Sequence, residues 1–297
     1  MQEQRRQTTP RRDLARHENF DEVSPDVGVL DEGAFDRALS EDADQALTLL
    51  GELIGATDVR LRELARNLAG RLAIDLTRSG EPRARGIGRL RRRPADRAEG
   101  DIDVDASLEA LVRSRSLGEP PALDELTVAE WGRHQTAICL VVDRSGSMGG
   151  DRLTTAAIAA AACAWRSPQD WSMLAFSNRA LVLKGQREHR PVEAVVDDVL
   201  LLRGFGTTDV SLALRTAAAQ LSLANAGRRL CILLSDCRPT EGEDPALAAA
   251  MLDELVIVAP AGDTEDAALL ASQVGARWVE LAGPSGVPAA FARLLDR

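Results

Sequence analysis

The sequence predicts an α/β fold: a doubly wound, Rossmann-like and mostly parallel sheet of about six strands, preceded by a helical N-terminal segment. From residue 135 onward, short continuous apolar runs alternate with stretches of helical period, as expected for a parallel sheet covered on both faces. Most connections between these runs are long enough for right-handed crossovers through helices. The runs 171–176 and 180–184 are separated by only three residues, which favours a hairpin and one antiparallel edge strand.

The expected elements follow from these periods. Strands are predicted near 136–142, 171–176, 180–184, 229–235, 254–259 and 276–281. Helices are predicted near 152–166, 191–201, 209–224, 244–252, 264–273 and 287–295. Together they define an expected domain over residues 135–297.

The N-terminal part divides into two segments. Residues 1–30 are polar and contain two prolines, so we expect them to be poorly ordered. Residues 31–80 have leucines at helical spacing, a predicted N-cap at Thr57 or Asp58, and a helix stop at Ser79 and Gly80.

Residues 81–134 form an arginine-rich and then acidic connector. Ser107 is expected to cap a short helix over 108–115, and 126–131 has the composition of a strand. Two interpretations stay open for the arginine run. It is a solvated stretch that pairs with the acidic residues after it, or a docking surface for an acidic partner or RNA.

Composition excludes several classes of function. The net charge of −10 and the absence of Tyr argue against a nucleic-acid-binding protein. The four cysteines lack the spacing of a zinc site. The polar start has no signal-peptide core, and no uncharged apolar run is long enough to span a membrane, so we expect a cytoplasmic protein.

Oxygen-bearing side chains gather in three loops of the predicted sheet. Asp143, Ser145 and Ser147 follow the first strand, 204–209 precedes a helix, and 235–239 follows the strand near 229–235. All three are expected at the rim where open α/β sheets bind ligands. Two carboxylates and several hydroxyls are hard donors, which Mg²⁺ prefers and Mn²⁺ shares, and water would complete the shell.

These loops resemble the metal-ion-dependent adhesion site of von Willebrand factor A (VWA) domains. The likeness covers about 135–297 and implies that Asp143, Ser145 and Ser147 hold Mg²⁺ directly or through water. Thr208 matches the family threonine better than Thr207, and Asp236 matches the aspartate that acts through water. In the family a partner's Asp or Glu completes the metal shell, and the metal catalyses nothing. Cys237 departs from the usual glycine, which would narrow the rim or, if the thiol is exposed, make it oxidation-sensitive.

Residues before position 135 indicate a more specific family resemblance. Residues 100–112 and 131–133 resemble the lead-in of bacterial CoxE-like proteins, which are generally paired with MoxR-type AAA+ ATPases in protein or cofactor maturation. The resemblance thus implies a non-enzymatic adaptor with a MoxR-type partner. The chain has no phosphate-binding G-x-x-x-x-G-K-[ST] loop of its own.

Three alternatives compete with this interpretation. The rim residues could be simple helix caps. Ser147 could be the nucleophile of a serine hydrolase, although the first position of the G-x-S-x-G elbow is Ser145 and no histidine follows Asp236. A haloacid dehalogenase-type phosphatase would require Asp at position 145, where this chain has Ser.

Overall fold

The computed structural model describes residues 8–79, 89–96, 101–132, 136–144, 150–202, 204 and 206–295. The chain divides into two compact units. The larger consists of Met1–Pro82 with Thr136–Arg297, and the smaller consists of Arg83–Gln135. Each is treated by itself below.

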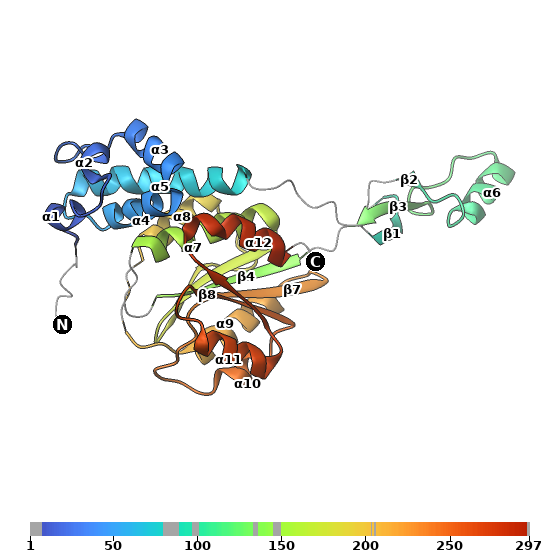
Figure 1. The fold of residues 1–297 in the computed structure, drawn as a ribbon. Helices are drawn as coiled ribbons and strands as arrows, with labels where there is room; N and C mark the ends of the chain where they lie inside the picture. The colour runs from blue at the N-terminus through green and yellow to red at the C-terminus, as the bar shows by residue number, and fades with distance from the viewer. Residues whose placement is uncertain are drawn as a thin grey trace. The chain divides into compact units, whose positions relative to one another are not determined.

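The larger unit is built on a six-stranded sheet in the order β6-β5-β4-β7-β8-β9 (Figure 1). Every neighbouring pair is parallel except β5 and β6, which form the expected antiparallel hairpin at one edge. The predicted fold class is therefore confirmed. The observed strands agree with the predicted ones to within one residue at either end: β4 (Thr136–Asp143), β5 (Trp171–Phe176), β6 (Ala180–Lys184), β7 (Arg228–Leu234), β8 (Glu254–Pro260) and β9 (Arg277–Leu281).

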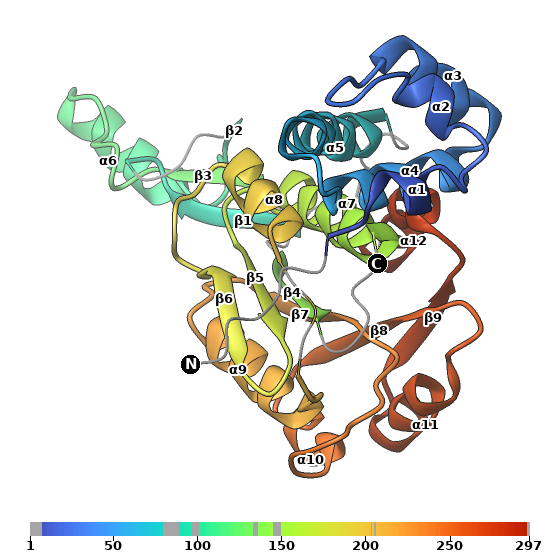
Figure 2. The same cartoon turned by 90° about the vertical axis from the view of Figure 1, so that its left-hand side faces the viewer.

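Helices cover both faces of this sheet (Figures 1 and 2). One face packs against α7 (Gly150–Arg166), α8 (Val192–Leu200) and α12 (Val287–Leu295), which follows the 3-10 turn η1 (Pro284–Gly286). The other packs against α9 (Val210–Ser222), α10 (Pro245–Ala249) and α11 (Glu265–Val274). Both faces of the sheet are apolar and must be covered. In β4, successive side chains alternate between the two cores: Ile138, Leu140 and Val142 face one, and Ala137, Cys139 and Val141 face the other.

The N-terminal helices belong to the same core as α7 and α8. They are α1 (Arg11–Leu14), α2 (Phe20–Val23), α3 (Glu32–Glu41), α4 (Ala43–Ile54) and α5 (Val59–Ser79). Asp58 caps α5, since its Oδ1 accepts hydrogen bonds from the backbone N–H groups of Arg60 and Leu61.

Residues 8–30 differ from the expectation of a poorly ordered segment. Leu14, Phe20 and Val23 are almost completely buried, and the Arg11 guanidinium lies 4.8 Å from the centre of the Phe20 ring. Three buried apolar side chains anchor α1 and α2 although the segment as a whole is polar.

The smaller unit is more than a connector. It contains a three-stranded antiparallel sheet, in the order β1-β3-β2, and one helix. The strands are β1 (Arg89–Pro94), β2 (Asp101–Ile102) and β3 (Thr127–Gly132), and the helix is α6 (Leu108–Leu117).

Two details of the smaller unit bear on the sequence predictions. The Ser107 hydroxyl does not cap α6, because it bonds to the backbone of Thr127 instead. Arg92 Nε lies 2.6 Å from Asp103 Oδ2, so one residue of the arginine run pairs with one of the acidic residues that follow it. Among the described residues, no helix is long and apolar enough to cross a membrane.

Candidate functional site

The first part of the site forms where β4 and β7 end side by side. These strands are parallel neighbours, so their carboxyl ends and the loops after them meet. Asp143, the last residue of β4, is only 8% exposed. Ser235 follows β7, and its hydroxyl donates a 2.7 Å hydrogen bond to Asp143 Oδ2. Ser235 Oγ also accepts a 2.9 Å hydrogen bond from the backbone N–H of Cys237, so Ser235 fixes both Asp143 and its own loop.

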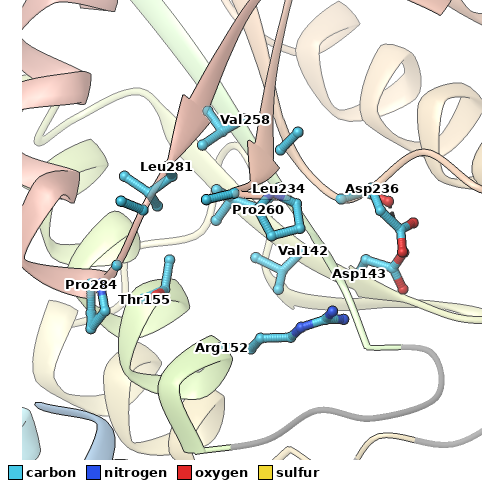
Figure 3. Close-up of a pocket in the computed structure, with 15 residues that line it drawn as sticks. Val142, Asp143, Arg152, Thr155, Leu234, Asp236, Val258, Pro260, Leu281 and Pro284 are labelled. Atoms are coloured by element: carbon cyan, nitrogen blue, oxygen red, sulfur yellow. Dashed lines mark hydrogen bonds between the residues drawn. The ribbon is translucent and has the colours of Figure 1, made fainter. Parts of the chain in front are cut away.

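Asp236 belongs to the loop after β7 and lies beside Asp143 (Figure 3). Its Oδ1 accepts a 3.0 Å hydrogen bond from the backbone N–H of Arg238. Burial raises the pKa of Asp236, and the negative charges of Asp143 and Asp263 raise it further against the opposing effects of Arg238 N–H and Arg152. The carboxylates of Asp143 and Asp236 lie close together away from bulk water and repel each other. A bound cation would relieve that repulsion.

Thr208 lies in the loop before α9 and is held by the loop after β7. Its backbone N–H donates to Thr240 Oγ1 at 2.7 Å, and its carbonyl accepts from the backbone N–H groups of Thr240 and Glu241 at 3.0 and 3.3 Å. Thr208 is buried whereas Thr207 is exposed. Both the N–H and the carbonyl of Thr208 are therefore held by hydrogen bonds to the loop after β7.

The next residue, Asp209, caps α9 through a 2.8 Å hydrogen bond from the backbone N–H of Leu212. Gly242 packs directly against it, since a Cβ there would lie 2.3 Å from Asp209 Oδ1, and its φ of +95° is one that glycine adopts without strain. The loop after β7 thus approaches the start of α9 closely enough to require a glycine.

The end of β5 is hydrogen-bonded to the loop after β4 and to the loop before α9. The backbone N–H of Arg144 donates to Phe176 O at 2.8 Å, and that of Asp209 donates to Ser177 O at 3.0 Å. Asp143, Asp236 and Thr208 therefore belong to loops at one rim of the sheet, as the sequence predicts. Ser145 and Ser147 lie outside the described residues.

The donor set fits an oxygen-liganded cation. Across the described residues, no group of three or more His, Cys, Asp or Glu could hold a metal. A site here would therefore depend on the two carboxylates together with hydroxyls and water. That donor chemistry suits Mg²⁺ or Mn²⁺ and not a soft metal such as Zn²⁺ bound by thiolates.

Cys237 is buried and not exposed at the rim. It is only 2% exposed, and burial and the neighbouring carboxylates raise the pKa of its thiol. Its φ of 61° lies in the left-handed region, where a glycine would be unstrained. Buried protonated thiols react slowly, so the structure favours an inert residue over an oxidation sensor.

Sequence reasoning missed two residues that position the site. The sequence prediction includes Ser235 only as part of the rim loop 235–239, and it does not include Thr240. Local sequence does not reveal the contact that either residue makes, because each acts on a residue at least 32 positions away. A hydroxyl residue directly after a buried strand is the one feature that could have drawn attention to Ser235.

A cavity of about 290 Å³ opens beside the two carboxylates (Figure 3). It extends over the carboxyl ends of β7, β8 and β9, and Arg152 and Thr155 of α7 form another wall. In Figure 3 the Arg152 side chain points toward Asp143 and Asp236.

Comparison with known proteins identifies the family. The model for "VWA domain containing CoxE-like protein" matches residues 55–263, which is more than half of the chain. The chain belongs to this family. Membership of the VWA CoxE-like family supports a protein-interaction module, and the match includes all five residues of the resemblance: Asp143, Ser145, Ser147, Thr208 and Asp236.

Solved structures of similar fold include a von Willebrand factor type A protein, a pilus adhesin and the protein BatB. A von Willebrand factor type A protein from Catenulispora acidiphila is 17% identical over 57% of this chain and 43% of its own, with a TM-score of 0.43. The pilus adhesin SpaC from Lactobacillus rhamnosus GG is 17% identical over 55% of this chain and 30% of its own, with a TM-score of 0.44. BatB from Bacteroides thetaiotaomicron is 15% identical over 53% of this chain and 96% of its own, with a TM-score of 0.43. These similarities are too low to add to the family match, and no curated protein matches the chain.

Proposed function

We propose that this VWA CoxE-like protein is a non-enzymatic adaptor that binds Mg²⁺ at the rim and, through it, an acidic residue of a partner protein. The observation that carries the proposal is the pair Asp143 and Asp236, brought together by adjacent parallel strands, with the pKa of Asp236 raised partly by the charge of Asp143. Thr208 on the neighbouring loop adds a hydroxyl residue to the same rim.

Each residue has a distinct part in this proposal. Asp143, oriented by Ser235, and Asp236 supply the negative charge, while Ser145, Ser147 and Thr208 supply hydroxyl ligands. Two carboxylates leave a divalent cation with little surplus negative charge around it. The bound cation would supply a Lewis-acid contact for one further carboxylate, and the partner provides that group.

The proposed partner is a MoxR-type AAA+ ATPase or a client of such an ATPase. The support is the family match, together with the absence from the sequence of a phosphate-binding loop. Any work driven by ATP hydrolysis would then come from the partner.

The rival function is a serine hydrolase with Ser147 as nucleophile. A histidine base would have to reach the loop after β4. His189 instead lines a cavity with Pro168 and Lys184, close to the start of β5 and so at the opposite end of that strand from Phe176. His17 pairs with Glu52 among the N-terminal helices, at a distance of 3.0 Å. A panel of chromogenic esters separates the functions, since turnover lost in Ser147→Ala would favour the hydrolase.

Thermal unfolding in increasing Mg²⁺ or Mn²⁺ tests the metal site. A cation that binds only the folded state stabilises it by about 2.7 kcal/mol at a concentration of 100 Kd. We expect the Tm of the wild type to rise, and the rise to be lost in Asp143→Asn, which keeps an acceptor for the Ser235 hydroxyl but removes the charge.

Asp253→Asn is the matched control, because Asp253 is an exposed carboxylate that precedes β8 at the other end of the sheet. Its response to metal should equal that of the wild type. Equal shifts in all three proteins would place the cation elsewhere, and no shift in the wild type would remove the support for a metal site. Partner capture that survives both EDTA and Asp143→Ala would contradict the metal bridge.

A further inference from the structure

The cavity beside the rim has two chemically different ends. Asp143, Ser235 and Asp236 form the polar end, and Arg152 lies on the wall next to them. The apolar end is built by side chains over the later strands: Val258, Pro260, Leu281 and Pro284. A ligand that fills the cavity must therefore carry a polar group and an apolar group a fixed distance apart.

Sheet geometry sets that distance. The polar end lies over β4 and β7, and the apolar end lies over β8 and β9, which are the next two strands in the sheet. Adjacent strands are about 4.8 Å apart, so the two ends are separated by roughly 5 Å (from β7 to β8) to roughly 14 Å (from β4 to β9). In an extended peptide, side chains two positions apart share a face and lie about 7 Å apart.

The far wall of the cavity is held in place by the N-terminal helices. Asp44 of α4 accepts a 3.0 Å hydrogen bond from the backbone N–H of Ser285. A Cβ at Gly283 would lie 2.4 Å from Asp44 Oδ1, so the chain before Pro284 packs closely against this carboxylate. The backbone N–H of Ala261 also donates to Leu281 O at 2.9 Å. The cavity is therefore preformed, which lowers the entropic cost of binding.

Charge and size then identify the occupant. Asp143 and Asp236 repel a carboxylate until a cation is bound, whereas a bound cation and Arg152 both attract one. The volume of about 290 Å³ is at the lower limit for small-molecule sites, which begin at about 300 Å³, and it accommodates an aliphatic side chain together with the short stretch of chain that leads to the polar end.

We propose that the cavity binds the aliphatic side chain of an extended partner segment whose acidic residue occupies the metal. The recognised sequence is Asp or Glu, then any residue, then Leu, Ile, Val or Met, within the partner chain. This inference rests on the proposed function and adds a rule for which acidic residues are selected.

Binding of capped heptapeptides to the full chain in Mg²⁺ tests the rule. The three probes have glycine flanks and carry Glu-Gly-Leu, Glu-Gly-Ser or Gln-Gly-Leu at the centre, with both ends blocked. Burial of a leucine side chain should make Glu-Gly-Leu bind about tenfold more tightly than Glu-Gly-Ser. Gln-Gly-Leu should not bind, and EDTA should abolish the binding of both peptides that contain Glu.

Cavity-filling variants test whether the preference for leucine over serine arises from this cavity. Ala282 and Ala261 are exposed and line the cavity, so Ala282→Leu or Ala261→Leu fills it without disturbing the core. Either variant should bind Glu-Gly-Leu and Glu-Gly-Ser equally. Ala219→Leu is the control, since Ala219 is exposed on α9 and does not line the cavity. It should keep the wild-type preference.

Each failure has a separate meaning. Equal Mg²⁺-dependent binding of Glu-Gly-Leu and Glu-Gly-Ser by the wild type would overturn the role of the cavity and leave the proposed function standing. Binding that ignores Mg²⁺ or the Glu would overturn both. If a fourth peptide that ends in Glu-Gly-Leu with a free carboxylate binds while the blocked heptapeptide does not, recognition of a chain end would replace that of an internal segment.

Discussion

At the scale of single residues, the candidate site depends on hydroxyl groups that are not themselves predicted ligands. Ser235 holds the Asp143 carboxylate, and Thr240 holds both backbone groups of Thr208. The three-loop motif predicts which residues lie on the rim, because the position of each loop at a strand end follows from the local pattern. It cannot predict these two contacts, which join residues 92 and 32 positions apart.

Replacing Thr240 tests whether this clamp matters. Thr240→Val removes the acceptor for the Thr208 N–H, so we expect the free energy of unfolding to fall by about 0.5–1.5 kcal/mol and the metal-dependent rise in Tm to weaken. Thr240→Ser keeps the hydroxyl and should restore the metal response. Urea unfolding with and without Mg²⁺ measures both effects. Identical metal responses of the Val and Ser variants would mean that the hydroxyl does not position Thr208.

At the scale of helices and strands, aspartate caps explain why many helices begin where they do. Asp31, Asp42, Asp58, Asp209 and Asp244 each accept a hydrogen bond from a backbone N–H in the first turn of the helix that follows. This satisfies donors that the helix itself leaves unpaired. Ser107 forms no such cap for α6, because its hydroxyl bonds to the sheet of the smaller unit.

The strands β7, β8 and β9 are joined near their amino ends by one carboxylate. Glu254 accepts from Arg228 Nε at 2.7 Å and from Arg228 Nη2 at 2.8 Å, and it also pairs with Arg277. The Arg228 hydrogen bond, followed by the charges of both arginines, holds the pKa of Glu254 below its usual value of 4.5. Burial opposes this effect but does not cancel it.

The sign of the pH dependence follows directly. A carboxyl with a lowered folded-state pKa stabilises the fold above its unfolded pKa, near 4.5, and loses that contribution as the pH falls through the folded value. Glu254→Gln should therefore lower the free energy of unfolding at pH 7 by about 1–2 kcal/mol, allowing for partial exposure. Its stability should also fall less steeply than that of the wild type below pH 4.5. Parallel curves for the two proteins, from chemical unfolding at pH 7 to 3.5, would contradict this assignment.

At the scale of the whole larger unit, the N-terminal helices and the sheet form one core. Buried residues of α4 and α5 belong to the same apolar cluster as those of α7, α8 and β4. Asp44 of α4 also holds the loop that forms the far wall of the cavity. The helical segment predicted over 31–80 thus contributes to the shape of the candidate binding site.

A substitution in α4 should destabilise the sheet as well. Leu50 is fully buried, and Leu50→Ala should cost about 2–5 kcal/mol through lost burial and the cavity left behind. The N-terminal helices contain no tryptophan, whereas Trp165, Trp171 and Trp278 lie in the sheet and its helices. Tryptophan fluorescence and far-UV circular dichroism should therefore shift together. Leu247→Ala, at a 72% exposed position, is the control and should change stability little. Separate transitions for the two signals would mean that the helices fold on their own.

The sequence by itself determined the α/β class and the order of strands and helices along the chain, which depend on local period and on turn residues. Its resemblance to VWA domains implied the five candidate residues of the adhesion site. Tertiary structure alone decided that residues 8–30 pack into the core, that 89–94, 101–102 and 127–132 pair into a small sheet, and that Ser235, Thr240 and Asp44 shape the rim and its cavity. The physical reason is that burial and hydrogen bonding between distant segments depend on which surfaces meet when the chain folds, and local sequence patterns do not record those meetings.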